Sequence, residues 1–400
     1  MAIETAPTTL KALRLHGRKN IQLDDVASQY ATPIARWRSQ LLTVGRKCGP
    51  DEVRLQIAFC GICGTDIHEY LGGPIFAPQP GTKNKVTGVE LPVTLGHEFS
   101  GTVIELGAGV KSLKHGQRVI VNPAMDERHL GLQPCSPCKT GCFNICRRSA
   151  SYGLSAEGGG FCEQSVVKAI SCIPLPDSVS LKVGALSEPL AVAWHCIRIS
   201  GFKQGQTALV LGAGPIGLAL LCLLKVWGAS KTIISEVTKA RIDQANKFGA
   251  DAVVNPLEPI AGSRQDEITD PVVAVCRDLT GGDGVDVAFD ATGMQSTLDA
   301  AIAATKPRGT IFNVAIHERP LLLNLNLLAQ QEKSIKGGIC YTDEDFHAVL
   351  KVLAEGRIPA EELITSVVPL SDVLNGGFME LINNKAKHVK ILIQPDLTKL

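Results

Sequence analysis

The stretch CGICGTDIHEY, residues 60–70, brings together residue types that can carry out metal and proton chemistry. Cys63 lies in a glycine turn after a β-rich run, Thr65 follows two positions later, and His68 lies further along the same stretch. A thiolate can bind a metal ion, and a hydroxyl near an imidazole can pass on a proton because histidine titrates near neutral pH. The stretch therefore predicts a metal ligand and the start of a proton path.

A second stretch, LVLGAGPIGLALL, matches the dinucleotide fingerprint G-x-G-x-x-G directly after an apolar strand and at the start of an apolar helix. The glycines allow a tight turn, the close approach of a pyrophosphate and close helix packing, and the helix N-terminus favours the anion. We expect the cofactor to contact this loop through Gly212, Gly214, Pro215, Ile216 and Gly217.

The choice between NAD and NADP depends on the end of the next predicted strand. Glu236 ends that strand about twenty residues past the glycines, where a carboxylate accepts hydrogen bonds from a ribose and repels a 2′-phosphate. This favours NAD, although Arg241 is close enough in the sequence to complicate the choice. Thr292 and Gly293, in FDATG at the end of a later strand, are expected to line the cofactor cleft.

The stretch TLGHEFSG adds two more candidate metal ligands, His97 and Glu98. Together with Cys63 they form a ligand set suited to a catalytic zinc, which uses three protein ligands and leaves a fourth position open. The competing interpretation is that the cysteine and the histidine are ordinary buried residues. Their occurrence beside a dinucleotide motif favours zinc.

Four further cysteines at short spacing in CSPCKTGCFNIC are typical of a structural zinc site. They are Cys135, Cys138, Cys142 and Cys146.

The elements that must position these residues fall into two parts of the chain with different secondary-structure patterns. Short β-rich runs at residues 53–60, 99–106 and 117–121 predict a barrel-like, mostly β domain. After about residue 200, strands alternate with glycine turns and helices, which predicts an α/β, doubly wound parallel sheet. We expect domains at residues 1–189, 190–337 and 338–400, the last returning to the first domain. Residues 27–50 form an unexplained insertion, either a surface excursion or a functional arm.

Composition excludes several classes of partner. Forty basic and thirty-nine acidic residues leave a net charge of +1, so neither nucleic acid nor an anionic membrane is favoured. The N-terminus lacks an apolar signal region, and no run is long enough to span a bilayer. Thirteen cysteines in a long chain predict free thiols and metal ligands in the cytosol. The expected partner is a small molecule.

The chain also resembles the zinc-dependent medium-chain alcohol and polyol dehydrogenases. CGICGTDIHEY, GHEFSG, GGGFCEQ, SEPLAVAWH and LGAGPIGL carry the resemblance, in this order and over nearly the whole chain. HEYLGGPIFAPQPG, EPLAVAWHCIRISGFKQG and ICYTDEDFHAVLKVLAEGRI carry a narrower resemblance to the 2,3-butanediol dehydrogenase subgroup. The resemblance implies a GroES-like catalytic domain, a Rossmann domain for NAD, a zinc ion and a homodimer or homotetramer.

The implied reaction is hydride transfer between NAD and a secondary alcohol, such as the 2,3-butanediol/acetoin pair. A sorbitol- or threonine-type dehydrogenase uses the same machinery and stays open as an alternative. A non-catalytic dinucleotide-binding protein and a zinc-free quinone reductase are disfavoured, because the candidate ligand and relay residues are all present.

By the same resemblance, Cys63 and His97 are zinc ligands, and Glu98 binds the ion directly or through water. Glu188, in SEPL, is a conditional ligand whose other interpretation is the acidic residue of a helix N-terminus. Thr65 and His68 form the proton relay; in the other interpretation His68 is a polar residue at the rim.

The resemblance also bears on the four cysteines and on one lysine. Cys135, Cys138 and Cys146 match three structural zinc ligands, but the position of the fourth ligand falls on Leu132. Either Cys142 or His129 completes the set, or the structural zinc is missing. Lys390 matches a basic contact to the cofactor pyrophosphate, and the other interpretation is a surface lysine.

Overall fold

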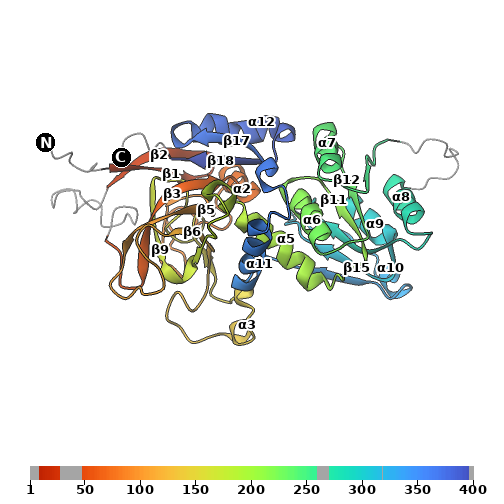
Figure 1. Cartoon of the computed structure of the whole chain (residues 1–400), viewed down its shortest axis with the longest axis horizontal. Coiled ribbons are helices and arrows are strands. Elements are labelled where there is room, and N and C mark those ends of the chain that lie inside the picture. Colours follow the sequence, from red (N-terminus) through yellow and green to blue (C-terminus); the bar gives the residue numbers. More distant parts are fainter. Residues whose placement is uncertain (1–8, 28–46, 259–269, 318, 396–400) are drawn as a thin grey trace. The chain divides into compact units, whose positions relative to one another are not determined.

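The computed structural model describes residues 9–27, 47–258, 270–317 and 319–395. The chain forms two compact units, Met1–Glu188 with Ala360–Leu400, and Pro189–Pro359. Figure 1 shows the first unit in both the red-to-yellow and the blue ends of the colour scale, because the C-terminal segment returns to it. The predicted insertion at residues 27–50 falls mostly on residues 28–46, which lie outside the described residues.

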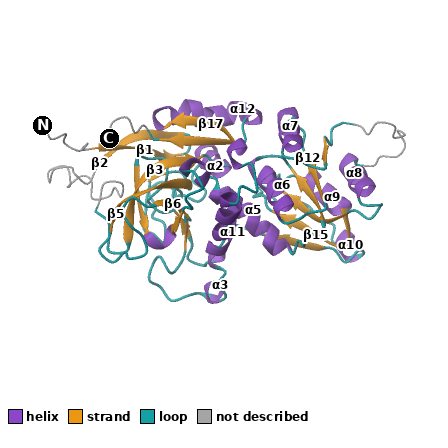
Figure 2. Ribbon diagram, viewed as in Figure 1, coloured by secondary structure: helices purple, strands orange, loops and turns teal. Residues whose placement is uncertain are grey.

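The first unit is rich in strands, as expected for a barrel-like domain (Figure 2). Its largest sheet has the order β10-β6-β5-β3-β18-β17, and β9 also pairs with β3; a second sheet has the order β2-β1-β4, and β7 pairs with β8. The strands are β1 (Thr9–Gly17), β2 (Asn20–Ala27), β3 (Glu52–Gly61), β4 (Val93–Thr94), β5 (Glu98–Leu106), β6 (Arg118–Val121), β7 (Ala124–Met125), β8 (Ala150–Ser151), β9 (Gln164–Lys168), β10 (Cys172–Pro174), β17 (Ile364–Pro369) and β18 (Lys390–Gln394).

Helices in the first unit are short. The one that matters most for the site follows β3 immediately. The α-helices are α2 (Gly64–Gly72), α3 (Ser136–Lys139), α4 (Leu181–Gly184) and α12 (Glu380–Asn384), and α5 (Ser187–Ser200) starts at the end of this unit. The core consists of alternate strand residues such as Leu55, Ile57 and Phe99, which are at most 1% exposed. Burial of these side chains stabilises the frame that holds α2.

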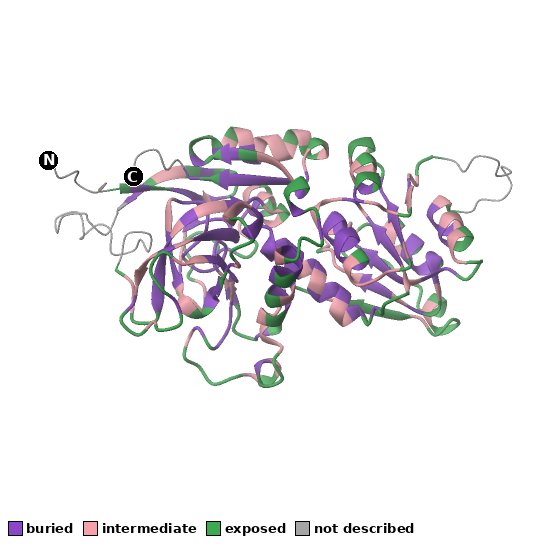
Figure 3. Ribbon diagram, viewed as in Figure 1, coloured by how far each residue is buried: buried purple, intermediate pink, exposed green. Residues whose placement is uncertain are grey.

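The second unit is the predicted doubly wound sheet, with six parallel strands in the order β13-β12-β11-β14-β15-β16. Its central strands β11 and β14 are largely buried, and its helices expose their outer faces (Figure 3). The elements are β11 (Thr207–Leu211), α6 (Pro215–Val226), β12 (Lys231–Ser235), α7 (Lys239–Lys247), β13 (Ala252–Val254), α8 (Pro271–Leu279), β14 (Val285–Asp290), α9 (Gln295–Ala304), β15 (Thr305–Asn313), α10 (Asn326–Ala329), β16 (Ser334–Gly337) and α11 (Asp343–Ala354).

The strand order reverses between β11 and β14, because the chain leaves β11 toward β12 and later returns to its other side. In sheets of this kind, ligands bind where the order reverses, at the carboxyl ends of the strands. Gly212 follows β11 and Ala291 follows β14, so the fingerprint loop and the FDATG turn both lie at this point.

The chain returns to the first unit at Ala360 and not at the predicted residue 338. The intervening helix α11 is held in the second unit by its buried Asp345, which accepts hydrogen bonds from Arg198 and pairs with His195 at 2.8 Å. The amphipathic pattern predicted this helix correctly, but a pattern does not say which domain a helix packs on. No helix in the described ranges is long and apolar enough to cross a membrane.

Candidate active site and metal centres

The first metal cluster is assembled by the antiparallel pairing of β3 and β5. In this register Gly61, at the end of β3, lies opposite Glu98, at the start of β5. Cys63 follows two residues later as the N-cap of α2, and His97 immediately precedes β5. A side chain at position 61 would collide with the Glu98 carboxylate, so glycine is required there. The pairing therefore brings together ligands that are distant in the sequence.

Cys63, His97 and Glu98 each offer one ligand atom, and these atoms all lie within 4.8 Å of one another. His97 and Glu98 are buried, with 6% and 1% exposure. A thiolate, an imidazole and a carboxylate at this spacing fit a catalytic zinc with one position left for another ligand. The predicted ligand set is thus brought together by the fold.

Asp66 is a functional residue that the sequence motifs did not reveal. Its carboxylate lies fully buried, accepts a hydrogen bond from the Cys63 backbone N–H at 2.9 Å and approaches His97 Nδ1 to 3.5 Å. Burial lowers the pKa of His97, but Asp66 and Cys63 raise it to well above its usual value. An imidazole facing two acidic groups favours a cation, and a carboxylate behind a metal-binding histidine is the usual orienting partner. Its position as N3 of α2 was the available signal.

The two predicted relay residues lie on α2, one turn apart. The Thr65 hydroxyl is 3.6 Å from the Cys63 sulfur, and His68 is exposed. Residues three apart are neighbours on a helix surface, so a hydroxyl near the metal cluster and an imidazole at the solvent share one face. This arrangement suits the predicted proton path.

Glu188 does not belong to the cluster of three ligand atoms. It lies in the first turn of α5 with 8% exposure. Its negative charge acts on the buried ammonium of Lys390. Glu188 therefore lies within electrostatic range of the site, and its role as a ligand stays conditional.

Lys390 was expected to contact the cofactor pyrophosphate or to be a surface lysine, and its burial excludes the surface alternative. It is buried at 4% exposure in the first unit, and its ammonium donates to both carboxylate oxygens of Glu98 at 2.7 Å and to the Ile62 carbonyl at 3.1 Å. These bonds use all three N–H groups of the lysine. The pyrophosphate contact stays a prediction, and the position of Lys390 in the sequence did not reveal its partner Glu98.

A second cluster consists of Glu127, Cys135, Cys138 and Cys146, whose ligand atoms also lie within 4.8 Å of one another. The Cys135 and Cys138 sulfurs are 3.5 Å apart. Burial raises the pKa of Glu127, but the Cys135 N–H and Arg148 lower it to about 2, so the group is a carboxylate. Three thiols and a carboxylate fit a tetrahedral zinc.

Neither of the two predicted candidates for the fourth ligand completes this cluster. The Cys142 sulfur lies beside Thr140, and His129 is held between the Asp126 backbone N–H at 3.1 Å and the Ser171 hydroxyl at 2.8 Å. Glu127 takes the fourth place, five positions before the exposed Leu132. An acidic residue at this distance from the cysteine run was the only signal in the sequence.

In the second unit, the fingerprint loop has the geometry that a dinucleotide needs. Gly212 adopts φ +95°, and a Cβ there would lie 2.7 Å from the Thr292 side chain. Above Gly214, the N-cap of α6, the first atom that a Cβ would meet is Arg241 Nη1 at 4.0 Å. This open space at a helix N-terminus fits a pyrophosphate.

Glu236 is bonded to the fingerprint loop. Its carboxylate accepts hydrogen bonds from the backbone N–H groups of Ala213, Val237 and Thr238 at 2.8–2.9 Å. A carboxylate has about four acceptor positions, so one remains for a ribose hydroxyl. Glu236 therefore stabilises the loop by its hydrogen bonds and is also a candidate ribose contact.

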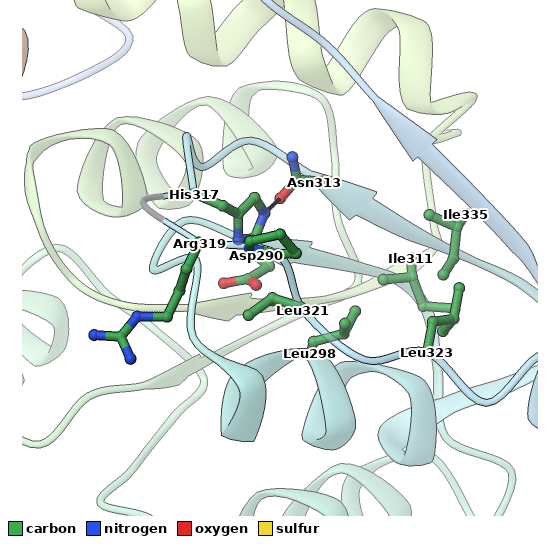
Figure 4. A pocket seen from close by; sticks show the side chains of 10 residues that line it. Asp290, Leu298, Ile311, Asn313, His317, Arg319, Leu321, Leu323 and Ile335 are labelled. Atoms are coloured by element: carbon green, nitrogen blue, oxygen red, sulfur yellow. Dashed lines mark hydrogen bonds between the residues drawn. The ribbon is translucent and has the colours of Figure 1, made fainter.

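The FDATG turn lies against the same loop through Thr292, whose N–H and hydroxyl both bond to Asp290. Beside it is a cavity of about 300 Å³ at the ends of β14 and β15. Figure 4 shows leucine and isoleucine side chains along one side and Asp290, Asn313 and His317 along the other. Sequence patterns did not predict this cavity, because its wall comes from the irregular segment before α10.

Comparisons with known proteins agree with this geometry. Residues 49–177 match the family model "Alcohol dehydrogenase GroES-like domain", and residues 215–355 match "Zinc-binding dehydrogenase". The chain is 40% identical to a probable diacetyl reductase of Saccharomyces cerevisiae, with 87% of this chain and 84% of the relative covered. It is 39% identical to the (R,R)-butanediol dehydrogenase of the same yeast, with 86% and 92% covered. The crystal structure of 2R,3R-butanediol dehydrogenase from Bacillus subtilis is 37% identical, with a TM-score of 0.83 and 97% and 100% covered.

Proposed function

The chain belongs to the zinc-binding alcohol dehydrogenases with a GroES-like domain, and we propose that it interconverts vicinal diols and hydroxyketones, such as 2,3-butanediol and acetoin. The observation that carries the proposal is the cluster of Cys63, His97 and Glu98 at the end of β3. The names of the most similar relatives support the substrate class. A sorbitol- or threonine-type substrate is the alternative.

In the proposed mechanism, a bound zinc ion would supply a Lewis acid that makes a substrate hydroxyl more acidic, and a bound dinucleotide would supply the hydride acceptor. Cys63, His97 and Glu98 would hold the ion, with Glu188 as a conditional fourth group. Asp66 fixes the orientation of the His97 ring by facing its Nδ1 atom.

The chain's own part in proton transfer begins at Thr65. Its hydroxyl takes the proton that the substrate hydroxyl loses and passes on its own proton toward His68. The exposed His68 imidazole then exchanges this proton with solvent. The helical spacing of the two residues supports this route.

The test is an assay of NAD reduction by the zinc-loaded protein with each stereoisomer of 2,3-butanediol, with sorbitol and with threonine. We expect kcat/KM for one butanediol stereoisomer to exceed that for the other two substrates by about tenfold or more. A chelator should abolish the activity, and added zinc should restore it. Equal or better use of sorbitol or threonine would favour the alternative, and chelator-insensitive activity would contradict the zinc mechanism.

The same assay tests the relay through His68→Gln. We expect a rate about tenfold lower at neutral pH and a changed pH profile, because the final proton acceptor is lost. His115→Gln is the matched control, since His115 is also an exposed histidine of the first unit. A His68→Gln enzyme with unchanged rate and profile would remove His68 from the mechanism.

We further propose NAD as the preferred dinucleotide, a cytoplasmic location and a homo-oligomeric state. The carboxylate of Glu236 at the ribose side supports NAD. All thirteen cysteines are free thiols, which supports a reducing compartment and can be checked by cell fractionation. The exposed edge strand of the second unit supports association with a second copy.

A further inference from the structure

A buried lysine faces the metal ligands of the first unit. Lys390 begins β18, is 4% exposed and donates two hydrogen bonds of 2.7 Å to Glu98, whose own exposure is 1%. The third N–H donates to the Ile62 carbonyl at 3.1 Å, one residue before Cys63. The ammonium is therefore fully satisfied, and it is fixed at the side of the ligand cluster.

The charge of this lysine is maintained by its surroundings. Burial lowers the pKa of Lys390, but the negative charges of Glu98 and Cys63 raise it above its ordinary value, with a further contribution from Glu188. The ammonium thus lies among three acidic groups that are assigned or conditional zinc ligands. In effect it acts as an internal counter-cation for the ligand set.

Glu98 consequently has two competing partners. Its carboxylate is paired with Lys390, yet one of its oxygens lies within 4.8 Å of the Cys63 sulfur and a His97 ring nitrogen. A carboxylate that ligates zinc must share or give up its bonds to the ammonium. This competition for the Glu98 carboxylate weakens the hold on the metal.

We propose that Lys390 sets the strength of zinc binding at this site by competing with the ion for the Glu98 carboxylate. Lys390 is a positioning residue that acts through Glu98, and the pair keeps the ligand cluster neutralised when the ion is absent. The proposal rests on the zinc site of the proposed function, but it adds a control of metal affinity that the catalytic mechanism does not require.

The test measures zinc release from the purified holoenzyme into excess chromogenic chelator, for the wild type and for Lys390→Met. The release phase of this site is the one that is absent from Cys63→Ser. We expect release from Lys390→Met to be about tenfold slower, which corresponds to about 1.4 kcal/mol, because the freed carboxylate binds the ion without competition. We also expect the visible spectrum of the cobalt-substituted protein to change, since Glu98 then becomes a permanent ligand.

Two control variants separate the effect of the Lys390 charge from the effect of any substitution at position 390 and from the effect of removing a lysine elsewhere in the unit. Lys390→Arg keeps the cation, so its release rate should stay close to that of the wild type. Lys168→Met removes another lysine of the same unit, which forms an ion pair of 2.8 Å with Asp51 and is not bonded to a candidate zinc ligand. This variant should also release zinc at the wild-type rate. Slower release in Lys168→Met as well would attribute the effect to general stability and overturn the proposal.

A double variant keeps the proposal testable if the buried, unpaired Glu98 prevents Lys390→Met from folding. Lys390→Met/Glu98→Gln removes both charges, and it should match Glu98→Gln alone in zinc release, because the lysine acts only through Glu98. A clear difference between these two variants would contradict the proposal.

The competing roles of Lys390 predict different results. If Lys390 binds the pyrophosphate, Lys390→Met should raise KM for the dinucleotide and leave the rate of zinc release unchanged. This result would overturn the proposal, while the dehydrogenase function would stand. A wild-type protein without zinc in the Cys63 cluster would instead contradict the proposed function itself. The two failures are therefore distinguishable.

Discussion

Glu236 has a structural role, and it is also the residue that we expect to influence the choice of cofactor. Three of its acceptor positions hold backbone N–H groups, which ties the end of β12 to the fingerprint loop. The remaining position is available to a ribose hydroxyl. We therefore expect a change at this residue to have a structural effect common to both dinucleotides and a separate effect that distinguishes NAD from NADP.

We expect Glu236→Ala to lower the ratio of kcat/KM for NAD to that for NADP by about tenfold or more, since a hydrogen bond to a charged group contributes about 1.5–3 kcal/mol. The ratio is the useful measure, because the three freed N–H groups should weaken binding of both cofactors. Arg241→Ala is the companion variant and should reduce only the residual activity with NADP. An unchanged ratio in Glu236→Ala would remove the residue from cofactor choice.

Residue motifs predicted the candidate ligands Cys63, His97 and Glu98, whose ligand atoms the fold brings within 4.8 Å of one another. They did not reveal Asp66 as the partner of His97, because that contact depends on the register of β3 and β5. The motifs also did not reveal Glu127 as a member of the cysteine cluster, because the path of an irregular loop brings it to the cysteines. Long-range register and loop paths are properties of the folded chain, and short motifs do not encode them visibly.

At the scale of elements, the segment from β7 to β8 has little regular structure to stabilise it. Its strands, helix α3 and the turn Phe143–Ile145 have four residues or fewer each, and Leu132 and Ile145 are exposed. A segment with so little regular structure needs a cross-link to hold its conformation, and a zinc ion bound by three thiols and a carboxylate would provide one. We therefore propose that the Glu127 cluster holds a structural zinc.

Metal analysis of the purified protein should find about two zinc ions per chain, one for each cluster. Cys138→Ser should lower the zinc content to about one per chain and lower Tm, because the segment loses its metal cross-link. Cys142→Ser is the matched control: it lies in the same cysteine run but outside the cluster, so it should keep the wild-type content. A wild-type content of one zinc that persists in Cys138→Ser would contradict the structural site.

Strands and helices were predictable because each carries its own periodicity and end signals. The helix α11, for example, begins with Thr342 and Asp345 in a capping box and has an apolar stripe. Its membership of the second unit was not predictable, since this depends on the distant His195 and Arg198. The element itself is thus readable from local sequence, whereas its packing partner is a tertiary property.

At the scale of the whole molecule, the second unit has a surface that a single copy does not cover. β16 is the last strand of the six-stranded sheet, and all four of its residues are exposed. The segment before it exposes Leu322 at 84%, Leu325 at 67% and Leu327 at 46%. An open strand edge beside exposed leucines favours pairing with another chain, and the same edge of a second copy can pair with it about a two-fold axis.

We therefore expect the wild-type protein to have at least the mass of a dimer in size-exclusion chromatography with light scattering. Leu322→Glu/Leu325→Glu should shift it toward the mass of one chain, because two buried charges would oppose association. Leu257→Glu is the matched control, since Leu257 is 77% exposed and follows β13 at the opposite edge of the sheet. A monomeric wild type, or an equal shift in both variants, would contradict association through β16, and the leucines would then need another partner.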